Sequence, residues 1–167
     1  PEIDAPKNGY PTIMASYLQS YISQVQGPNE LEPEGPKGIV ALSGVYGYEP
    51  IPNELSASEA QLVLGTEACL WGEFTPTAEH TEYMLYPRLA ALSEVLWTPK
   101  DNLDWKRFSE KIPALFERFD AMGITYSRSA YAVSAKSTLD MKNGTISVAL
   151  SNEFPDSDIR YALNDEK

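Results

Sequence analysis

Two short apolar segments, separated by a long Pro-rich stretch, constrain the fold more than any other feature of this chain. The first is YPTIMAS, residues 10–16, and the second runs from about residue 62 to residue 71. Short apolar runs bounded by turn residues are typical of buried strands. The order strand, crossover, strand, helix is used by α/β barrels and doubly wound sheets, and two strands cannot close either one. The sequence therefore predicts the C-terminal portion of a larger α/β domain.

Helical signals surround the second strand. Ser56 and Glu59 form a capping box that predicts a short helix just before it. Residues 75–97 predict a helix that Pro87 kinks or restarts, and residues 104–123 predict an amphipathic helix ending at Gly123. We expect two apolar stripes to pack in the core, one of Leu85, Leu89, Leu92 and Leu96, the other of Trp105, Phe108, Ile112, Leu115, Phe119 and Met122. Trp97 and Trp105 are expected to pack the helices against the sheet.

The residues after Tyr126 have a different character. TISVAL, 145–150, and IRYAL, 159–163, alternate apolar and polar residues, which predicts two strands. Asn143-Gly144 predicts a hairpin turn before the first of them, and this interpretation is preferred over use of the Asn143 sequon. A domain boundary is therefore expected near residues 127–133. Two strands are too few to bury a sheet face alone.

The overall charge and the single Cys and His exclude several kinds of partner. A formal net charge of -11 repels phosphate backbones, so nucleic acid is not expected as a partner. No apolar run approaches the roughly 20 residues that a membrane span needs. Cys69 and His80 are single and lie on different elements, which argues against a Cys/His zinc site. We interpret Cys69 as a small buried hydrophobe, and the sequence implies no metal or organic cofactor.

An aromatic residue and a hydrogen-bonding residue stand two positions apart at the end of each predicted strand. These pairs are Trp71 with Glu73 and Tyr17 with Gln19. Side chains two apart on a strand share a face. An aromatic ring can stack on a sugar while the polar group binds hydroxyls. Aromatic residues at strand ends also commonly pack a barrel rim, so the pattern alone leaves both interpretations open.

Longer motifs add a family resemblance. GTEACLWGEF, then EYMLYPRLAALSEVLW, then DWKRFSEKIPALFERFDAMGITY resemble the end of the catalytic barrel of family 20 glycoside hydrolases, the β-N-acetylhexosaminidases. YPTIMASYLQSY resembles the preceding strand, and the resemblance covers about residues 8–128. It implies that residues 1–128 are the C-terminal portion of a (β/α)8 TIM barrel, with its last two strands and helices. Residues 129–167 resemble the start of a small β-sandwich-like domain.

The resemblance also implies roles for the four residues. In the family the substrate's own acetamido oxygen attacks the anomeric carbon, in a substrate-assisted retaining mechanism. Tyr17 matches the tyrosine that orients the acetamido group, Trp71 an aromatic of the −1 subsite, and Glu73 a carboxylate that binds sugar hydroxyls. Gln19 departs from the Asp that the family usually has there. The expected ligand is an N-acetylhexosaminide.

The family's catalytic Asp-Glu pair has no match. It lies in a His-x-Gly-Gly-Asp-Glu motif, and the only adjacent pair here is Asp165-Glu166 in a polar terminus. His80 near a helix start is not expected to act as a base. Glu82, Arg88 and Glu94 are expected to form structural ion pairs and not to take part in catalysis. We therefore expect this chain alone to be inactive and the remainder of the same polypeptide to supply the acid.

Two alternatives to part of an enzyme remain open at the level of sequence. The chain could be a non-catalytic carbohydrate-binding or scaffolding module derived from the barrel, or a partial barrel that pairs with itself through exposed strand edges. The oligomeric state, the choice between N-acetylglucosamine and N-acetylgalactosamine and the linkage are not specified by the sequence. Export to the periplasm or the extracellular space is expected of the complete protein from family habit alone.

Overall fold

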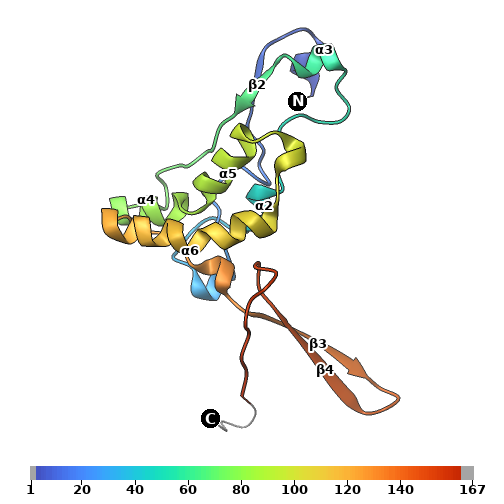
Figure 1. Ribbon diagram of the computed structural model, residues 1–167, viewed down its shortest axis with the longest axis vertical. Coiled ribbons are helices and arrows are strands. Elements are labelled where there is room, and N and C mark those ends of the chain that lie inside the picture. Colours follow the sequence, from blue (N-terminus) through green and yellow to red (C-terminus); the bar gives the residue numbers. More distant parts are fainter. Residues whose placement is uncertain (1–2, 163–167) are drawn as a thin grey trace.

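The computed structural model describes residues 3–162 and shows a small mixed α/β body from which a β-hairpin projects (Figure 1). Strand β2 and helix α3 lie at one end, the longer helices occupy the middle, and the hairpin extends from the other end. The helices of the body are α1 (Asp4–Lys7), α2 (Leu42–Tyr46), α3 (Ala57–Ala60), α4 (Ala78–Leu85), α5 (Arg88–Trp97) and α6 (Trp105–Met122), with 3-10 turns at Asn29–Leu31, Lys100–Asn102 and Ser129–Tyr131.

Strands β1 (Thr12–Met14) and β2 (Val63–Thr66) pair in parallel, as expected for consecutive strands joined by a crossover. Both are shorter than the sequence predicts, and this corrects the strand expected over 62–71. The amide of Glu67 donates to the carbonyl of Met14 over 3.0 Å and ends the ladder. Because β1 offers no further partner, residues 67–71 leave the sheet as a loop.

The capping box before β2 is confirmed. The amide of Glu59 donates to the Ser56 hydroxyl, and the Glu59 carboxylate accepts from the Ser56 amide over 2.7 Å. Thus one of the orphan amides of the first turn is satisfied, and the helix begins where the sequence predicts. It lasts only from Ala57 to Ala60 before the chain enters the strand.

The predicted break at Pro87 is confirmed, and it changes which residues are buried. Tyr86 is extended, α4 ends before it, and α5 begins at Arg88. The break shifts the helical phase, so the stripe predicted from four leucines is wrong for Leu96, which is exposed. The buried face consists of Met84, Arg88, Ala91, Leu92 and Val95. Trp97 is 89% exposed, which corrects its expected packing role.

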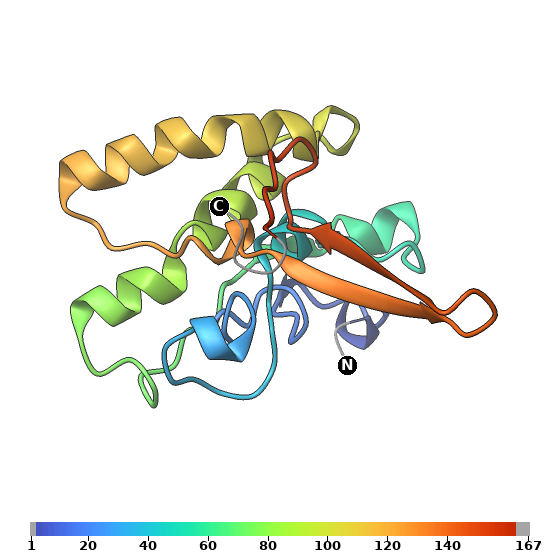
Figure 2. The same ribbon diagram turned by 90° about the horizontal axis from the view of Figure 1, so that it is seen from below.

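Helix α6 lies alongside α5 (Figure 2), and most of its predicted face is buried. Gly123 takes a φ of 70°, the left-handed conformation expected of a residue that ends a helix. Met122 is 70% exposed, which corrects its place on the core face, and Phe116 is buried in addition. The core brings Met14 of β1 together with α2, α5 and α6; its members are Met14, Val40, Leu42, Val45, Tyr46, Tyr48, Ala91, Leu92, Val95, Phe108, Ile112, Phe116, Phe119 and Ala130.

The tail forms an antiparallel hairpin of β3 (Ser134–Asp140) and β4 (Thr145–Ser151). The predicted turn is confirmed, with Gly144 at a φ of 61°. The sequence did not predict β3, because it is polar and exposed along its whole length. Leu139 and Ile146 pair across the hairpin and are more than half exposed. The strand predicted over 159–163 is wrong for residues 159–162, which have no strand structure, and Leu163 lies outside the described residues.

Candidate functional site

The four predicted site residues lie in two loops that leave the carboxyl ends of neighbouring strands. Tyr17 and Gln19 follow β1, and Trp71 and Glu73 follow β2. They are not strand residues, so alternation along a strand does not set their directions. Because β1 and β2 are parallel and adjacent, both loops nevertheless begin at the same edge of the sheet.

Hydrogen bonds join the two loops. The amide of Cys69 donates to the carbonyl of Ser20 over 2.9 Å. The Ser23 hydroxyl accepts from the amide of Trp71 over 2.9 Å and lies 3.5 Å from the carbonyl oxygen of Cys69, to which it donates. Ser20 and Ser23 are buried, so these bonds satisfy polar groups that water does not reach.

The two aromatic residues predicted for the site face solvent. Tyr17 is 61% exposed and Trp71 is 59% exposed, and Glu73 is exposed as well. The ring of Tyr17 contacts that of Tyr21, with centroids 5.2 Å apart. Gln19 is half-buried, and its side-chain oxygen accepts from the Ser16 hydroxyl. Exposed rings beside polar side chains can stack on a sugar ring and bind its hydroxyls.

A buried arginine lies behind the loop that follows β1. Arg88 is fully buried, and its guanidinium donates to the carbonyl oxygens of Ile22, Gln24, Val40 and Met84 at 2.6–3.0 Å. Burial lowers the pKa of Arg88 to about 9, and the negative charge of Glu32 opposes this shift. The role of Arg88 is structural, but its hydrogen-bond partners are carbonyl oxygens and not the ion pair expected from the sequence. The sequence reveals neither its carbonyl partners nor the roles of Ser20 and Ser23. A charged residue among apolar residues on the buried face of a helix is nevertheless a signal that it has buried hydrogen-bond partners.

Among the described residues, the other titratable ones singled out in the sequence lie in the loop after β2 and on helices α4 and α5. Cys69 is half-buried rather than buried, and burial together with the nearby Glu67 carboxylate raises the pKa of its thiol. His80 lies in the first turn of α4, where its amide donates to the Thr77 hydroxyl over 3.1 Å. The carboxylate of Glu94 pairs with Lys111, and that of Glu82 accepts from the Thr125 amide. Asp165 and Glu166 lie outside the described residues.

Within residues 3–162, no group of three or more His, Cys, Asp or Glu side chains is arranged to hold a metal ion. No helix among those residues is long and apolar enough to cross a bilayer.

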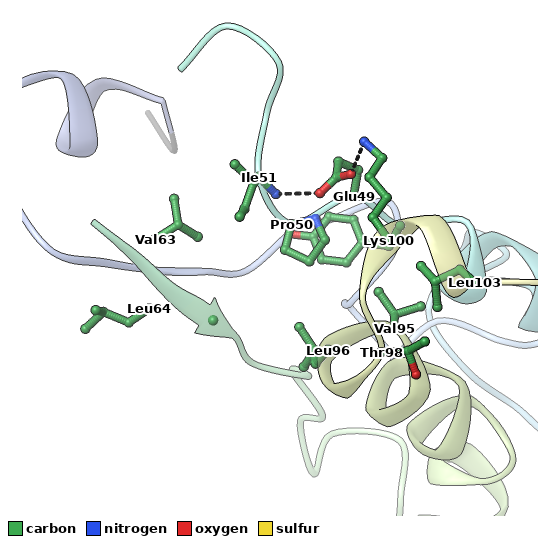
Figure 3. Close-up of a pocket in the computed structure, with 12 residues that line it drawn as sticks. Glu49, Pro50, Ile51, Val63, Leu64, Val95, Leu96, Thr98, Lys100 and Leu103 are labelled. Atoms are coloured by element: carbon green, nitrogen blue, oxygen red, sulfur yellow. Dashed lines mark hydrogen bonds and ion pairs between the residues drawn. The ribbon is translucent and has the colours of Figure 1, made fainter. Parts of the chain in front are cut away.

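A pocket of about 300 Å³ lies beside β2, at the ends of α5 and the loop after α2 (Figure 3). Apolar side chains form most of its wall, and they come from β2, from α5 and from the loops that contain Pro50, Ile51 and Leu103. An ion pair between Lys100 and Glu49 lies at its edge. None of the four predicted site residues lines it. Few polar groups converge there, so the two loops remain the better candidate for a carbohydrate site.

A family model and several relatives of similar sequence point to the same family of proteins. The model of "Glycosyl hydrolase family 20, catalytic domain" matches residues 2–100. A β-hexosaminidase of Porphyromonas gingivalis is 39% identical over 106 residues, which are 64% of this chain and 14% of that protein. The β-hexosaminidase subunit beta of Mus musculus is 39% identical over 79 residues, 47% of this chain and 15% of that protein. The chain thus spans about one seventh of these relatives.

Solved structures agree with the sequence comparison. The family 20 β-N-acetylhexosaminidase of Streptomyces coelicolor A3(2) superposes with a TM-score of 0.66 at 27% identity, over 76% of this chain and 26% of that one. A β-N-acetylhexosaminidase of Streptomyces plicatus gives a TM-score of 0.67 at 27% identity, over 76% of this chain and 25% of that one. Since the family model matches more than half of the residues, this chain belongs to glycosyl hydrolase family 20.

Proposed function

We propose that this chain forms part of a β-N-acetylhexosaminidase, which removes terminal N-acetyl-β-hexosaminides by a substrate-assisted retaining mechanism. The family membership supports a glycoside hydrolase. The relatives named β-hexosaminidase support the reaction, and a mutant enzyme of Streptomyces plicatus was solved in complex with the product GlcNAc. The ligand is therefore an N-acetylhexosaminide, and the catalytic Asp-Glu pair comes from the remainder of the same polypeptide.

One observation carries the proposal at the level of residues. The two loops that bear the predicted site residues leave the same edge of a parallel strand pair and are tied together through Ser20, Ser23, Cys69 and Trp71. In α/β barrels the chemistry lies at the carboxyl ends of the strands. A sugar bound at this edge can therefore contact both loops at once.

Each of the four residues receives a role in this proposal. The Tyr17 hydroxyl donates to the substrate's acetamido oxygen and holds it near the anomeric carbon, which raises the rate by proximity. The Trp71 ring lines the −1 subsite and covers the sugar's apolar face. Glu73 and Gln19 bind the outer hydroxyls, Glu73 as a charged acceptor and Gln19 as a neutral donor and acceptor.

The proposed architecture is an incomplete barrel. Ile13 of β1 and Leu64 of β2 are 57% and 68% exposed, whereas parallel strands in α/β proteins are normally covered on both faces. We assign residues 1–128 to the C-terminal part of the barrel and residues 129–167 to the start of a small β-domain. The exposed apolar residues Leu139 and Ile146 of the hairpin then face further strands of that domain. The complete protein is proposed to be exported.

Hydrolysis of an aryl N-acetyl-β-glucosaminide tests the function. We expect turnover by the complete protein in which residues 1–167 occur and none by these residues alone, because the His-x-Gly-Gly-Asp-Glu motif is absent from them. Tyr17→Phe in the complete protein should lower kcat strongly, while Tyr10→Phe, another exposed tyrosine, should not. Turnover by residues 1–167 alone would refute the assignment of the acid to another segment.

A carbohydrate-binding module is the second candidate, favoured by the exposure of both Tyr17 and Trp71. In that case residues 1–167 alone would bind N-acetylglucosamine saturably, and Trp71→Ala would abolish binding. Trp97→Ala is the matched control, since Trp97 is 89% exposed on α5 and lies outside both loops. Binding without turnover by the complete protein would favour this module over the enzyme.

A further inference from the structure

We propose that Arg88 is a positioning residue of the hexosaminidase site. From the buried side of the loops, it fixes the positions of the two sugar-binding loops relative to each other. The inference rests on the function proposed above and adds a residue that touches no sugar. It follows from which backbone atoms the guanidinium contacts and from what those segments contact in turn.

The guanidinium forms hydrogen bonds to the residues on either side of Ser23 in the first loop. Arg88 donates to the carbonyl oxygen of Ile22 over 2.7 Å and to that of Gln24 over 2.8 Å. Ser23, which lies between these two residues, is the residue whose hydroxyl accepts from the Trp71 amide. The position of Ser23, and through it the start of the Trp71 segment, is therefore set by the two carbonyl groups that Arg88 holds.

The same contact reaches Tyr17. The side chain of Gln24 lies 3.5 Å from the carbonyl oxygen of Tyr17 and donates to it, and Gln24 is 4% exposed. The guanidinium thus contacts the first loop directly at Ile22 and Gln24, and Ser23, which lies between them, connects that loop to the second. The terminal nitrogens Nη1 and Nη2 also donate to Val40 and Met84, which anchors the guanidinium to the core segment before α2 and to α4, whereas its Nε–H is buried without a hydrogen-bond partner.

The chemistry requires arginine at this position. Lys carries three donors on one nitrogen, and they cannot span four carbonyl oxygens that approach a guanidinium from different directions. Within residues 3–162, Arg88 forms no direct ion pair with a carboxylate; its four hydrogen-bond acceptors are carbonyl oxygens, while the charges of Glu32 and Glu153 act on it without direct contact. A geometric clamp of this kind acts on loop position and not on substrate charge.

The test uses the complete protein, with Arg88→Lys compared with Ile112→Ala. Ile112 is fully buried on α6, so its variant reports general loss of stability without touching the loops. We expect Arg88→Lys to lower kcat for an aryl N-acetyl-β-glucosaminide by about tenfold to a hundredfold, as for other small misplacements of reacting groups, with a smaller change in KM. Ile112→Ala should keep kcat at temperatures where it is folded.

Two further measurements separate positioning from stability. Amide hydrogen exchange should become faster in peptides covering 20–26 and 67–73 of Arg88→Lys and stay unchanged in 105–122. In a double-mutant cycle with Tyr17→Phe, the effect of Arg88→Lys on kcat should shrink, because both changes disturb the same acetamido contact. Ile112→Ala should show no such coupling with Tyr17→Phe.

The outcomes distinguish this inference from the function on which it rests. An active wild-type enzyme in which Arg88→Lys leaves kcat or loop exchange unchanged, or is fully additive with Tyr17→Phe, overturns the positioning role alone. A complete wild-type protein that hydrolyses no N-acetyl-β-hexosaminide overturns the proposed function and with it the proposed effect of Arg88 on kcat. The exchange measurement still decides in that case whether Arg88 holds the loops.

Discussion

The hydroxyl of Ser23 accepts a hydrogen bond from the backbone amide of Trp71 over 2.9 Å, although the two residues belong to loops after different strands. Ser23 is 4% exposed and Trp71 is 59% exposed, so the bond is partly buried. A hydroxyl is one of the few side-chain groups small enough to accept from one loop while donating to the Cys69 carbonyl of the same loop. This single residue therefore couples the two candidate sugar-binding segments.

Replacing Ser23 by Ala should weaken that coupling. The change leaves the Trp71 amide without its acceptor; a fully buried donor would cost about 1–3 kcal/mol, and the cost here should be near the lower end because the bond is partly buried. We expect a lower urea midpoint and, in the complete enzyme, reduced kcat/KM. Ser93→Ala is the control, because Ser93 is exposed on α5 and donates only to the Leu89 carbonyl of its own helix. Equal effects of the two changes would show that the loop contact contributes nothing.

The face of α6 can be tested by two truncations. Ile112 is fully buried and Met122 is 70% exposed, although both belong to the apolar stripe predicted from the sequence. Ile112→Ala should lower the free energy of unfolding by about 2–5 kcal/mol. Met122→Ala should change it by no more than about 0.5 kcal/mol, as is usual for exposed sites. Urea unfolding of both variants measures this, and a large loss at Met122 would contradict the helix orientation.

Replacing Gly123 by Ala should lower the stability of the protein, whereas replacing Gly44 by Ala should raise it. Gly123 ends α6 at a φ of 70°, and a Cβ there would meet no atom within 4 Å, so only backbone conformation opposes Ala. That conformation costs a residue with a Cβ about 1–2 kcal/mol. Gly44 lies within α2, is equally open and has an ordinary φ, so Ala should stabilise the helix by about 1 kcal/mol. Thermal unfolding of the two variants should shift in opposite directions.

The capping box predicts a specific pH dependence. Hydrogen bonds from Ser56 lower the pKa of Glu59 below its ordinary value of 4.5. The stability contributed by this carboxylate is therefore present above that value and is lost as the pH falls through the lower pKa of the folded state. Between pH 6 and pH 3, the thermal midpoint of Glu59→Gln should decline less steeply than that of the wild type. Parallel declines would mean that the box does not form in solution.

Local signals predicted much of this fold correctly, because each depends on a few neighbouring residues. The capping box at Ser56, the break at Pro87, the helix end at Gly123 and the hairpin turn at Gly144 all lie where the sequence predicts them. Each reflects a backbone requirement that one residue type satisfies, so distant contacts do not alter it.

What depended on distant partners was predicted less well. The length of β2 is set by where β1 stops offering hydrogen bonds, and the residues of β2 do not encode that limit. The polar strand β3 carries no apolar alternation and forms through pairing with β4. Arg88 lies on a helix face and gives no hint that its partners are carbonyls of residues 22, 24 and 40. The roles of Tyr17, Gln19, Trp71 and Glu73 stay predictions, and the structure supplies the loops that connect them.

Gln19 provides a direct test of whether the first loop touches the sugar. Its side chain accepts from Ser16 within the same loop, so a carboxylate at this position would find the same donor. Hydrogen bonds that involve a charged group are about twice as strong as neutral ones. If residue 19 binds an outer hydroxyl of the substrate, Gln19→Asp in the complete enzyme should lower KM for an aryl N-acetyl-β-glucosaminide. Gln61→Asp, at an exposed position outside both loops, should leave KM unchanged. An active enzyme in which both variants keep the wild-type KM would remove Gln19 from the subsite, while Tyr17 and Trp71 would have to be judged from their own variants.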